Sequence, residues 1–187
     1  MQKKLQKKLE LNYSSNVLDI IQFGSSIMED SEPNDIDIAV FFKFIPLKQQ
    51  LEEAQNIKKQ IEKYFNLPIH IKSYDFYSFF DRGNFAKENI LFYGKSLIHN
   101  KYFAEFFGLF PKLQISYSLK ELKKKDKIKF NYLLNGKGGK YGLLRKHGGK
   151  ILKPGLIEIK PEHENIFIGR IKNITQNFAI KKLLSPK

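Results

Sequence analysis

Two aspartates separated by one residue, Asp35 and Asp37, have a spacing that suits metal chemistry. On a strand, residues at i and i+2 point to the same face, so both carboxylates can reach one divalent cation. Mg²⁺ prefers such oxygen ligands. Gly24 and Ser25 precede the acids across a spacer of nine residues. Glycine lets a backbone approach a phosphate closely. Singly, these are an ordinary turn and solvated acids, but together they predict a phosphate and metal site.

The elements expected to position these residues are two strands joined by a loop. Residues 17–23 (VLDIIQF) are apolar enough for a buried strand. Residues 29–34 are polar and contain a proline, which predicts a loop. Residues 35–42 predict a second strand, whose alternating start places both aspartates on one face. A short amphipathic helix is expected upstream, over residues 5–11.

A helix and two further strands are expected next. Apolar residues at steps of three and four predict an amphipathic helix over residues 47–65. Residues 69–72 (IHIK) predict a strand, with its isoleucines inward and His70 and Lys72 on the opposite face. Residues 89–98 predict a helix end, a glycine turn and a fourth strand. The fold class predicted is therefore α/β or α+β, with a mixed sheet and covering helices.

This arrangement resembles the superfamily of DNA polymerase beta-like nucleotidyltransferases, and in particular the minimal nucleotidyltransferases of bacteria and archaea. The likeness covers about residues 1–100 and includes the long helix after the acids. Its motifs are the hydrophobic-Gly-Ser run at 23–25, the alternating acids at 35–38 and the ending YGKSL at 93–97. The resemblance implies transfer of a nucleoside monophosphate from a nucleoside triphosphate (NTP) substrate to an acceptor. It also implies Mg²⁺ or Mn²⁺ as cofactor, held by the two aspartates.

The resemblance also assigns a nucleotide-binding role to the turn after the first strand. Gly24, Ser25 and Ser26 lie where the superfamily binds the nucleotide phosphates. Lys72 shares a predicted strand face with His70, where its ammonium group can contact a phosphate or neutralise the acids. We therefore expect these four residues to bind nucleotide.

The chain departs from the superfamily at the third acid, whose position on the neighbouring strand is taken by His70. Histidine is a poorer Mg²⁺ ligand than a carboxylate. Its imidazole exchanges protons near neutral pH, so it can act as a base instead. The catalytic candidates are Asp35, Asp37 and His70. Asp75 is the nearest following acid, but it would reach the site only through a bulge or bend.

Composition narrows the class of protein. The chain has 187 residues, of which 42% are hydrophobic and 17 are phenylalanines, enough to bury a core. It has no cysteine, which excludes disulfides and thiolate metal sites. No run approaches the roughly 18 apolar residues of a membrane span, and the N-terminus lacks the apolar core of a signal peptide. We expect a cytoplasmic protein that does not bind a membrane.

The net charge is distributed unevenly along the chain. Residues 1–105 carry 14 basic and 14 acidic residues, whereas residues 106–187 carry 19 and 5, so the second part holds the whole net charge of +14. We predict a nucleotidyltransferase-like domain over 1–105 and a small basic α+β domain over 106–187 that binds nucleic acid. A solvated lysine surface is the alternative interpretation.

The basic part contains a glycine-rich segment, residues 136–150. Flexible backbone and cations can follow a phosphate backbone, and an aromatic ring can stack on a base. The segment is not a P-loop, because the spacing Gly-x-x-x-x-Gly-Lys-Ser/Thr is absent. A mobile solvated loop is the alternative. The nucleic-acid-binding candidates are Lys137, Lys140, Tyr141, Arg145, Lys146 and Lys150.

Several elements are also predicted for the basic part. Ser118 to Glu121 fits a capping box, which predicts a helix from there to Leu134 that ends at Asn135 and Gly136. Strands are expected on both sides of the Pro154-Gly155 turn, a helix start at Pro161, and a last strand over residues 178–184.

Three hypotheses of function follow. The first is an active nucleotidyltransferase whose basic part binds a nucleic-acid acceptor, for which RNA is the first candidate. The second is a catalytically impaired nucleotidyltransferase fold that only binds nucleotide or nucleic acid, which His70 favours. The third is an antitoxin-like module that acts through a protein partner. A homo-oligomer is compatible with each of them.

Overall fold

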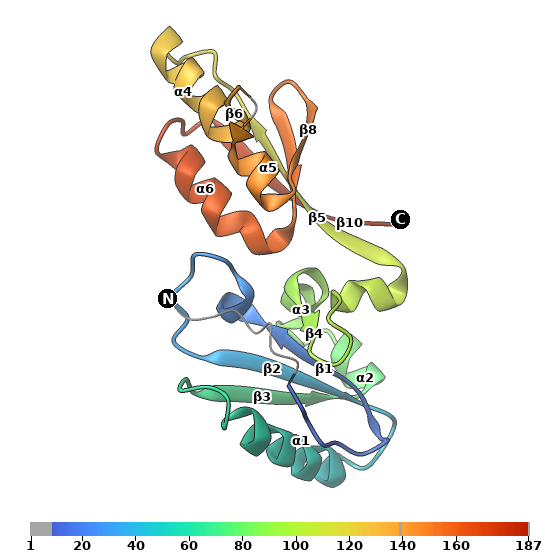
Figure 1. Cartoon of the computed structure of the whole chain (residues 1–187). Coiled ribbons are helices and arrows are strands. Elements are labelled where there is room, and N and C mark those ends of the chain that lie inside the picture. Colours follow the sequence, from blue (N-terminus) through green and yellow to red (C-terminus); the bar gives the residue numbers. More distant parts are fainter. Residues whose placement is uncertain (1–8, 139, 187) are drawn as a thin grey trace. The chain divides into compact units, whose positions relative to one another are not determined.

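The computed structural model describes residues 9–138 and 140–186, and these residues form two compact units (Figure 1). The first unit contains residues 9–27 and 32–106, and the second contains residues 28–31 and 107–186. Each unit has a four-stranded sheet and its own helices, which confirms the predicted mixed α and β class. Among the described residues, no helix is long and apolar enough to cross a membrane.

The sheet of the first unit has the strand order β3-β2-β1-β4. β1 pairs antiparallel with both β2 and β4, whereas β2 and β3 are parallel. Parallel neighbours need a crossover, and helix α1 (Leu47–Ile61) supplies it. The strands are β1 (Val17–Phe23), β2 (Ile36–Phe42), β3 (Ile69–Tyr74) and β4 (Lys95–Ser96), which confirms the strands predicted around the acids.

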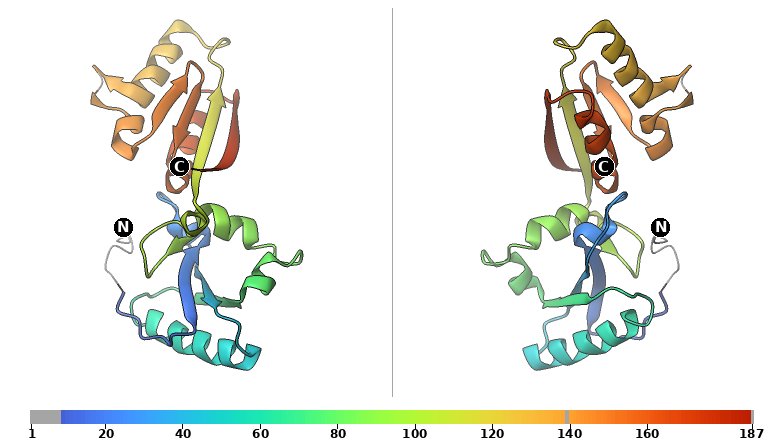
Figure 2. Two further views of the ribbon diagram at one scale, coloured as in Figure 1. Left: turned by 90° about the vertical axis from the view of Figure 1, so that its right-hand side faces the viewer. Right: turned by 90° about the vertical axis from the view of Figure 1, so that its left-hand side faces the viewer.

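Helices cover both faces of this sheet (Figures 1 and 2). Ile36, Ile38, Val40 and Phe42 of β2 lie in one buried cluster with side chains of α1. Ala39 and Phe41 lie in a second cluster with Phe79 of α2 and Ile90 of α3 on the opposite face. Because side chains alternate along a strand, Asp37 belongs to this second face. The remaining elements of the unit are η1 (Gly24–Ile27), α2 (Phe76–Phe80) and α3 (Lys87–Tyr93). The short helix η2 (Phe103–Phe107) begins in this unit and ends at the first residue of the next segment, 107–186.

Two details near the start of the first unit differ from the sequence prediction. Residues 5–8 of the predicted first helix lie outside the described residues, and residues 9–11 are not helical. Helix α1 begins with two exposed leucines, Leu47 and Leu51. Its buried stripe starts instead at Gln50, whose amide donates a hydrogen bond to the carbonyl of Ile45. Gln50, a buried polar residue with a hydrogen-bond partner, therefore occupies a position where hydrophobic periodicity predicts an apolar residue.

The sheet of the second unit is wholly antiparallel and has the order β10-β5-β9-β8. Alternate residues of β5 and β9, among them Leu113, Ile115, Ile157 and Ile159, are buried. The intervening side chains include Gln114, whose amide donates to Glu158 on the same face of the sheet. The strands are β5 (Leu109–Tyr117), β8 (Lys150–Lys153), β9 (Leu156–Ile159) and β10 (Phe178–Pro186).

The helices of the second unit supply the other half of its core. Phe130 and Leu134 of α4, and Phe167 and Ile171 of α6, are almost fully buried. A two-stranded hairpin joins α4 to the short helix α5. The bounds are α4 (Lys124–Asn135), β6 (Gly136–Lys137), β7 (Lys140–Tyr141), α5 (Leu143–His147), η3 (Pro161–His163) and α6 (Glu164–Lys172).

The helix predicted to open at Ser118 begins later, at Lys124, and its first turn has no side-chain cap. The capping-box prediction was wrong because residues of another segment bind both ends of the motif. The amide N–H of Ser118 donates to the carbonyl of Asn177, and Glu121 accepts a hydrogen bond from the Asn177 side chain. The predicted helix end at Gly136 is confirmed, since this glycine has a φ of 76° at the C-cap.

Candidate functional site

Asp35, Asp37 and His70 come together at one edge of the first sheet. Asp37 and His70 are register partners on the parallel strands β2 and β3, and Asp35 directly precedes β2. The Nδ1 atom of His70 lies 3.1 Å from Asp35 Oδ2 and 4.0 Å from Asp37 Oδ1. One ligand atom from each residue lies within 4.8 Å of the others. Residues far apart in the sequence therefore form one polar cluster.

Gly24 lies against this cluster at the end of the neighbouring strand. Its φ is 76°, a conformation that L side chains rarely adopt. A Cβ atom at Gly24 would lie only 2.3 Å from Asp37 Oδ2. Its amide N–H donates to Asn89 Oδ1 at 3.3 Å. Both the backbone conformation and the close approach of Asp37 therefore require glycine at this position.

The two serines after Gly24 differ in their surroundings. Ser25 is exposed in the four-residue η1 turn. The hydroxyl of Ser26 donates to the carbonyl of Phe23 and accepts a hydrogen bond from the Gln22 amide. These local bonds hold the turn closed after β1. Ser25 therefore has the more accessible side chain of the two.

The electrostatics of the cluster are those of a partly buried carboxylate pair. Burial raises the pKa of the Asp37 carboxyl above its usual value, and the neighbouring charge of Asp35 raises it further. His70 and Lys72 oppose that rise in pKa. The side chains of Asp35 and Asp37 keep 34% and 28% of their exposure, so water reaches both of them. A cation bound beside the two carboxylates would offset their mutual repulsion.

Lys72 shares a sheet face with His70 and Asp37. It is the register partner of Ala39, two residues further along both strands, and its side chain is exposed. The ammonium group of Lys72 therefore lies near the two acids. Among the described contacts, it forms no ion pair that would fix its position. This position suits a residue that meets an anionic ligand.

Asp75, the alternative candidate for the third acid, caps a helix and does not join the cluster. The pairing of β2 with β3 continues without a bulge to Tyr74, so nothing redirects Asp75 to the cluster. Its carboxylate instead caps α2 by accepting a hydrogen bond from the Ser78 N–H at 2.7 Å. This bond is the main reason that the pKa of Asp75 lies below its usual value. The residue facing the two acids on β3 is His70.

The basic candidates of the second unit are distributed over the β6–β7 hairpin, α5 and the start of β8. Tyr141 is 94% exposed and has a φ of 64°. Lys137, Arg145 and Lys146 are also exposed. Lys150 forms an ion pair with Glu158 at 3.1 Å, which offsets part of its charge. Lys140 belongs to β7, but its side chain lies outside the described part of the chain.

A second cluster, which the sequence analysis missed, consists of Glu29, His147 and His163. Glu29 and His163 are separated by 134 positions, so no local spacing predicts their contact. The available hint is composition, since the chain contains four histidines and two of them fall in the basic part.

The first cluster thus combines paired carboxylates, an imidazole, a nearby cation and a glycine turn that allows close approach. Such a set of groups can hold a divalent cation and an anionic ligand side by side. Comparison of the sequence with known protein families gives no matching family, and comparison with curated proteins gives no relative.

Proposed function

We propose that the first unit transfers a nucleoside monophosphate from an NTP to an acceptor. The observation that carries this proposal is the convergence of Asp35, Asp37 and His70 beside the Gly24 turn. Nucleotidyl transfer breaks a phosphoanhydride bond that carries several negative charges. Its catalysis therefore depends on positioning and charge stabilisation, which paired acids, a divalent ion and a phosphate-binding turn supply.

The residues present fit Mg²⁺ or Mn²⁺. Asp35 and Asp37 offer oxygen ligands at the spacing that a strand imposes, and their partial exposure leaves room for water ligands. The raised pKa of Asp37 indicates a carboxylate that gains from a nearby cation. When bound, such an ion stabilises the charge that develops on the phosphoryl oxygens.

His70 takes the place of the third acid in this proposal. When its Nδ1–H donates to Asp35 at 3.1 Å, the other ring nitrogen carries a lone pair that can accept a proton. His70 then removes the proton of the acceptor hydroxyl, while Asp35 holds the ring in the required tautomer. Lys72 and the Gly24–Ser25 turn orient the triphosphate.

The acceptor in this proposal is a nucleic acid, and RNA is the form that we would test first. Residues 106–187 carry the whole net charge of +14, and Lys137 of the hairpin and Lys146 of α5 are exposed. The exposed ring of Tyr141 adds a surface on which a base can stack. Phosphate contacts of this kind give affinity without sequence specificity.

The test is transfer of label from each α-labelled NTP, with Mg²⁺ and either total RNA or total protein as acceptor. Label should enter one acceptor class in the wild type. His70→Ala should remove most of the transfer, by roughly 10²-fold or more if His70 is the base. His70→Asp, which restores a third carboxylate, should raise metal affinity. No transfer with any NTP and either acceptor would refute the proposal of an enzyme.

The second candidate function is a nucleotide-binding or antitoxin-like module of the same fold, which we keep because His70 replaces an acid ligand. This candidate predicts that NTP binds in the presence of Mg²⁺ and that the NTP stays intact. It also predicts that His70→Ala leaves NTP affinity unchanged. Binding without label transfer, combined with an indifferent His70→Ala variant, would select it over the enzyme.

A further inference from the structure

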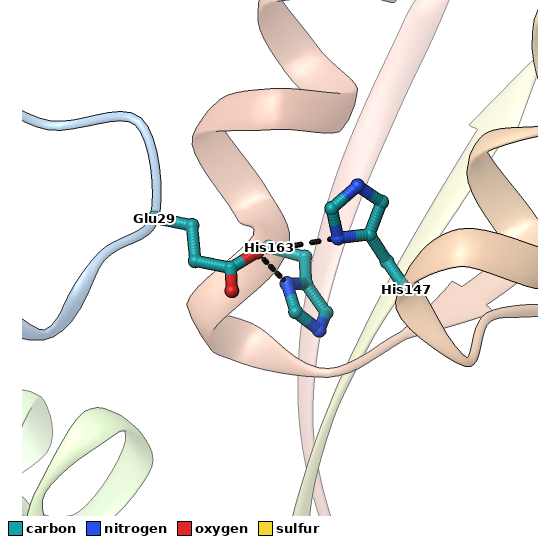
Figure 3. Close-up of side chains that lie close together, drawn as sticks. All are labelled: Glu29, His147 and His163. Atoms are coloured by element: carbon teal, nitrogen blue, oxygen red, sulfur yellow. Dashed lines mark hydrogen bonds and ion pairs between the residues drawn. The ribbon is translucent and has the colours of Figure 1, made fainter. Parts of the chain in front are cut away.

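Glu29, His147 and His163 meet in the second unit from three separate segments (Figure 3). Glu29 lies in the 28–31 segment, His147 ends α5 and His163 ends η3. The Nδ1 atoms of His163 and His147 lie 2.5 Å and 3.2 Å from the same oxygen, Glu29 Oε2. Three groups of metal-ligand type are thus aimed at one point.

Backbone contacts hold each of the three residues in place. The amide of Glu29 donates to the carbonyl of Glu162 at 2.9 Å, directly beside His163. Gly148, with a φ of 67°, ends α5 immediately after His147, and the His147 imidazole points toward Glu29 (Figure 3). The rings of His147 and His163 have centroids 4.7 Å apart. The cluster is therefore built by the fold and not by chance contact of flexible side chains.

Burial distinguishes this cluster from a surface ion pair. The side chains of His147, His163 and Glu29 are only 9%, 11% and 19% exposed. Removal of a carboxylate from water is costly unless a positive charge compensates it.

We propose that Glu29, His147 and His163 form a binding site for a divalent transition-metal ion of the Zn²⁺ class. Two imidazoles and one carboxylate are a common Zn²⁺ ligand set that leaves one position open for water. Ligands about 2.1 Å from a tetrahedral ion lie roughly 3.4 Å apart, close to the 3.2 Å between His147 Nδ1 and Glu29 Oε2. The separation of His163 Nδ1 and Glu29 Oε2 is 2.5 Å and must lengthen by roughly 0.9 Å to reach the same spacing.

The ligand chemistry also separates this site from the acids of the first unit. Imidazole ligands favour Zn²⁺, Co²⁺ and Ni²⁺, whereas Mg²⁺ prefers carboxylates and water. The proposal concerns a different ion held by different residues and does not depend on nucleotidyl transfer. In the second unit, the ion would fasten the 28–31 segment to η3 and the end of α5.

The experiment is a Co²⁺ titration of the full chain, freed of metal with a chelator, followed by visible absorption. Asp35→Asn/Asp37→Asn is the background, because it removes the carboxylates of the other candidate site. One equivalent of Co²⁺ should give the intense bands of tetrahedral coordination, and Zn²⁺ should abolish them by displacing Co²⁺. Absence of tetrahedral bands and of Zn²⁺ binding would overturn the proposal.

Variants identify the ligands. His147→Ala, His163→Ala and Glu29→Gln should each weaken Co²⁺ affinity by at least about tenfold, since each removes a direct ligand. His99→Ala is the matched control, because His99 is exposed in the first unit, and it should change nothing. Equal affinity in the background and all three variants would overturn the proposal.

Thermal unfolding gives a second readout that remains valid if a histidine variant folds poorly. Glu29→Gln keeps the size of the side chain and an oxygen that can accept both histidine hydrogen bonds. Zn²⁺ should therefore raise the unfolding midpoint of the background protein and not that of its Glu29→Gln derivative. An equal rise in both proteins would contradict the assignment of Glu29 as a ligand.

Discussion

Replacement of Gly24 by alanine should prevent metal binding by the acid cluster, although neither aspartate is substituted. The added methyl group would lie 2.3 Å from Asp37 Oδ2, although ordinary van der Waals contacts are 3.4–4 Å. The carboxylate must then withdraw by roughly 1 Å to restore a normal contact. A Mg²⁺–oxygen bond is only about 2.0–2.1 Å long, so a shift of this size breaks it. We expect Gly24→Ala to lower Mn²⁺ affinity by at least about tenfold.

The same substitution also has a cost in the backbone. A non-glycine residue at a φ of 76° is destabilised by about 1–2 kcal/mol. Gly108→Ala is the matched control, because Gly108 has a φ of 70° and nothing within 4 Å of an added Cβ. Both variants should therefore lose about 1–2 kcal/mol of unfolding free energy, but only Gly24→Ala should lose metal affinity.

Titration with Mn²⁺, followed by calorimetry or electron paramagnetic resonance, measures the metal affinity. Denaturant unfolding measures the free energy of unfolding. Each variant is compared with the wild type under identical conditions. The reasoning fails if Gly24→Ala binds Mn²⁺ as tightly as Gly108→Ala does. In that event Asp37 would not need its observed position to bind the ion.

Three further predictions concern other parts of the molecule. Burial raises the pKa of Asp19 in the folded protein. The protonated form therefore favours folding, and ionisation of Asp19 opposes folding as the pH rises. Relative to Asp19→Asn, wild-type stability should fall from about pH 4 upward through the folded-state pKa; parallel curves of unfolding midpoint against pH would contradict this. Asp75→Ala should cost about 0.5–2 kcal/mol through loss of the α2 cap, seen in denaturant unfolding, and leave Mn²⁺ affinity unchanged. RNA affinity should fall steeply with salt, and Lys146→Glu should reduce the log–log slope by about one, whereas Lys63→Glu in the first unit should not. Equal slopes in these two variants would argue against an RNA surface on the second unit.

The first sheet was predictable because its strands have strong local patterns. The apolar runs of β1 and β2 and the alternation of β3 place Asp37 and His70 on one face, since the side-chain period of a strand is two. The structure adds the register that pairs these two residues. The parallel direction of that pairing depends on the crossover through α1, which no single strand encodes.

The second unit was less predictable because its long strand β5 contains a proline, which normally argues against a central strand. Pro111 pairs with Leu184 of β10 and lies outside the stretch of β5, Leu113 to Ser116, that pairs with β9. At Pro111, β5 therefore has a neighbour on one side only, and a proline is tolerated at such an edge position. The Glu29 cluster also escaped the sequence analysis. Its residues are joined only by tertiary packing, and hydrophobic periodicity contains no information about such contacts.

The most direct test of the central claim compares α-labelled and γ-labelled NTP as label donors for the wild type and Asp35→Asn/Asp37→Asn. Nucleotidyl transfer moves the α-phosphorus to the acceptor and releases the γ-phosphorus with the leaving group. We expect α-label, and no γ-label, on the acceptor of the wild type with Mg²⁺, and neither label with the double variant. Transfer of γ-label, or equal α-label with the double variant, would contradict nucleotidyl transfer at Asp35 and Asp37.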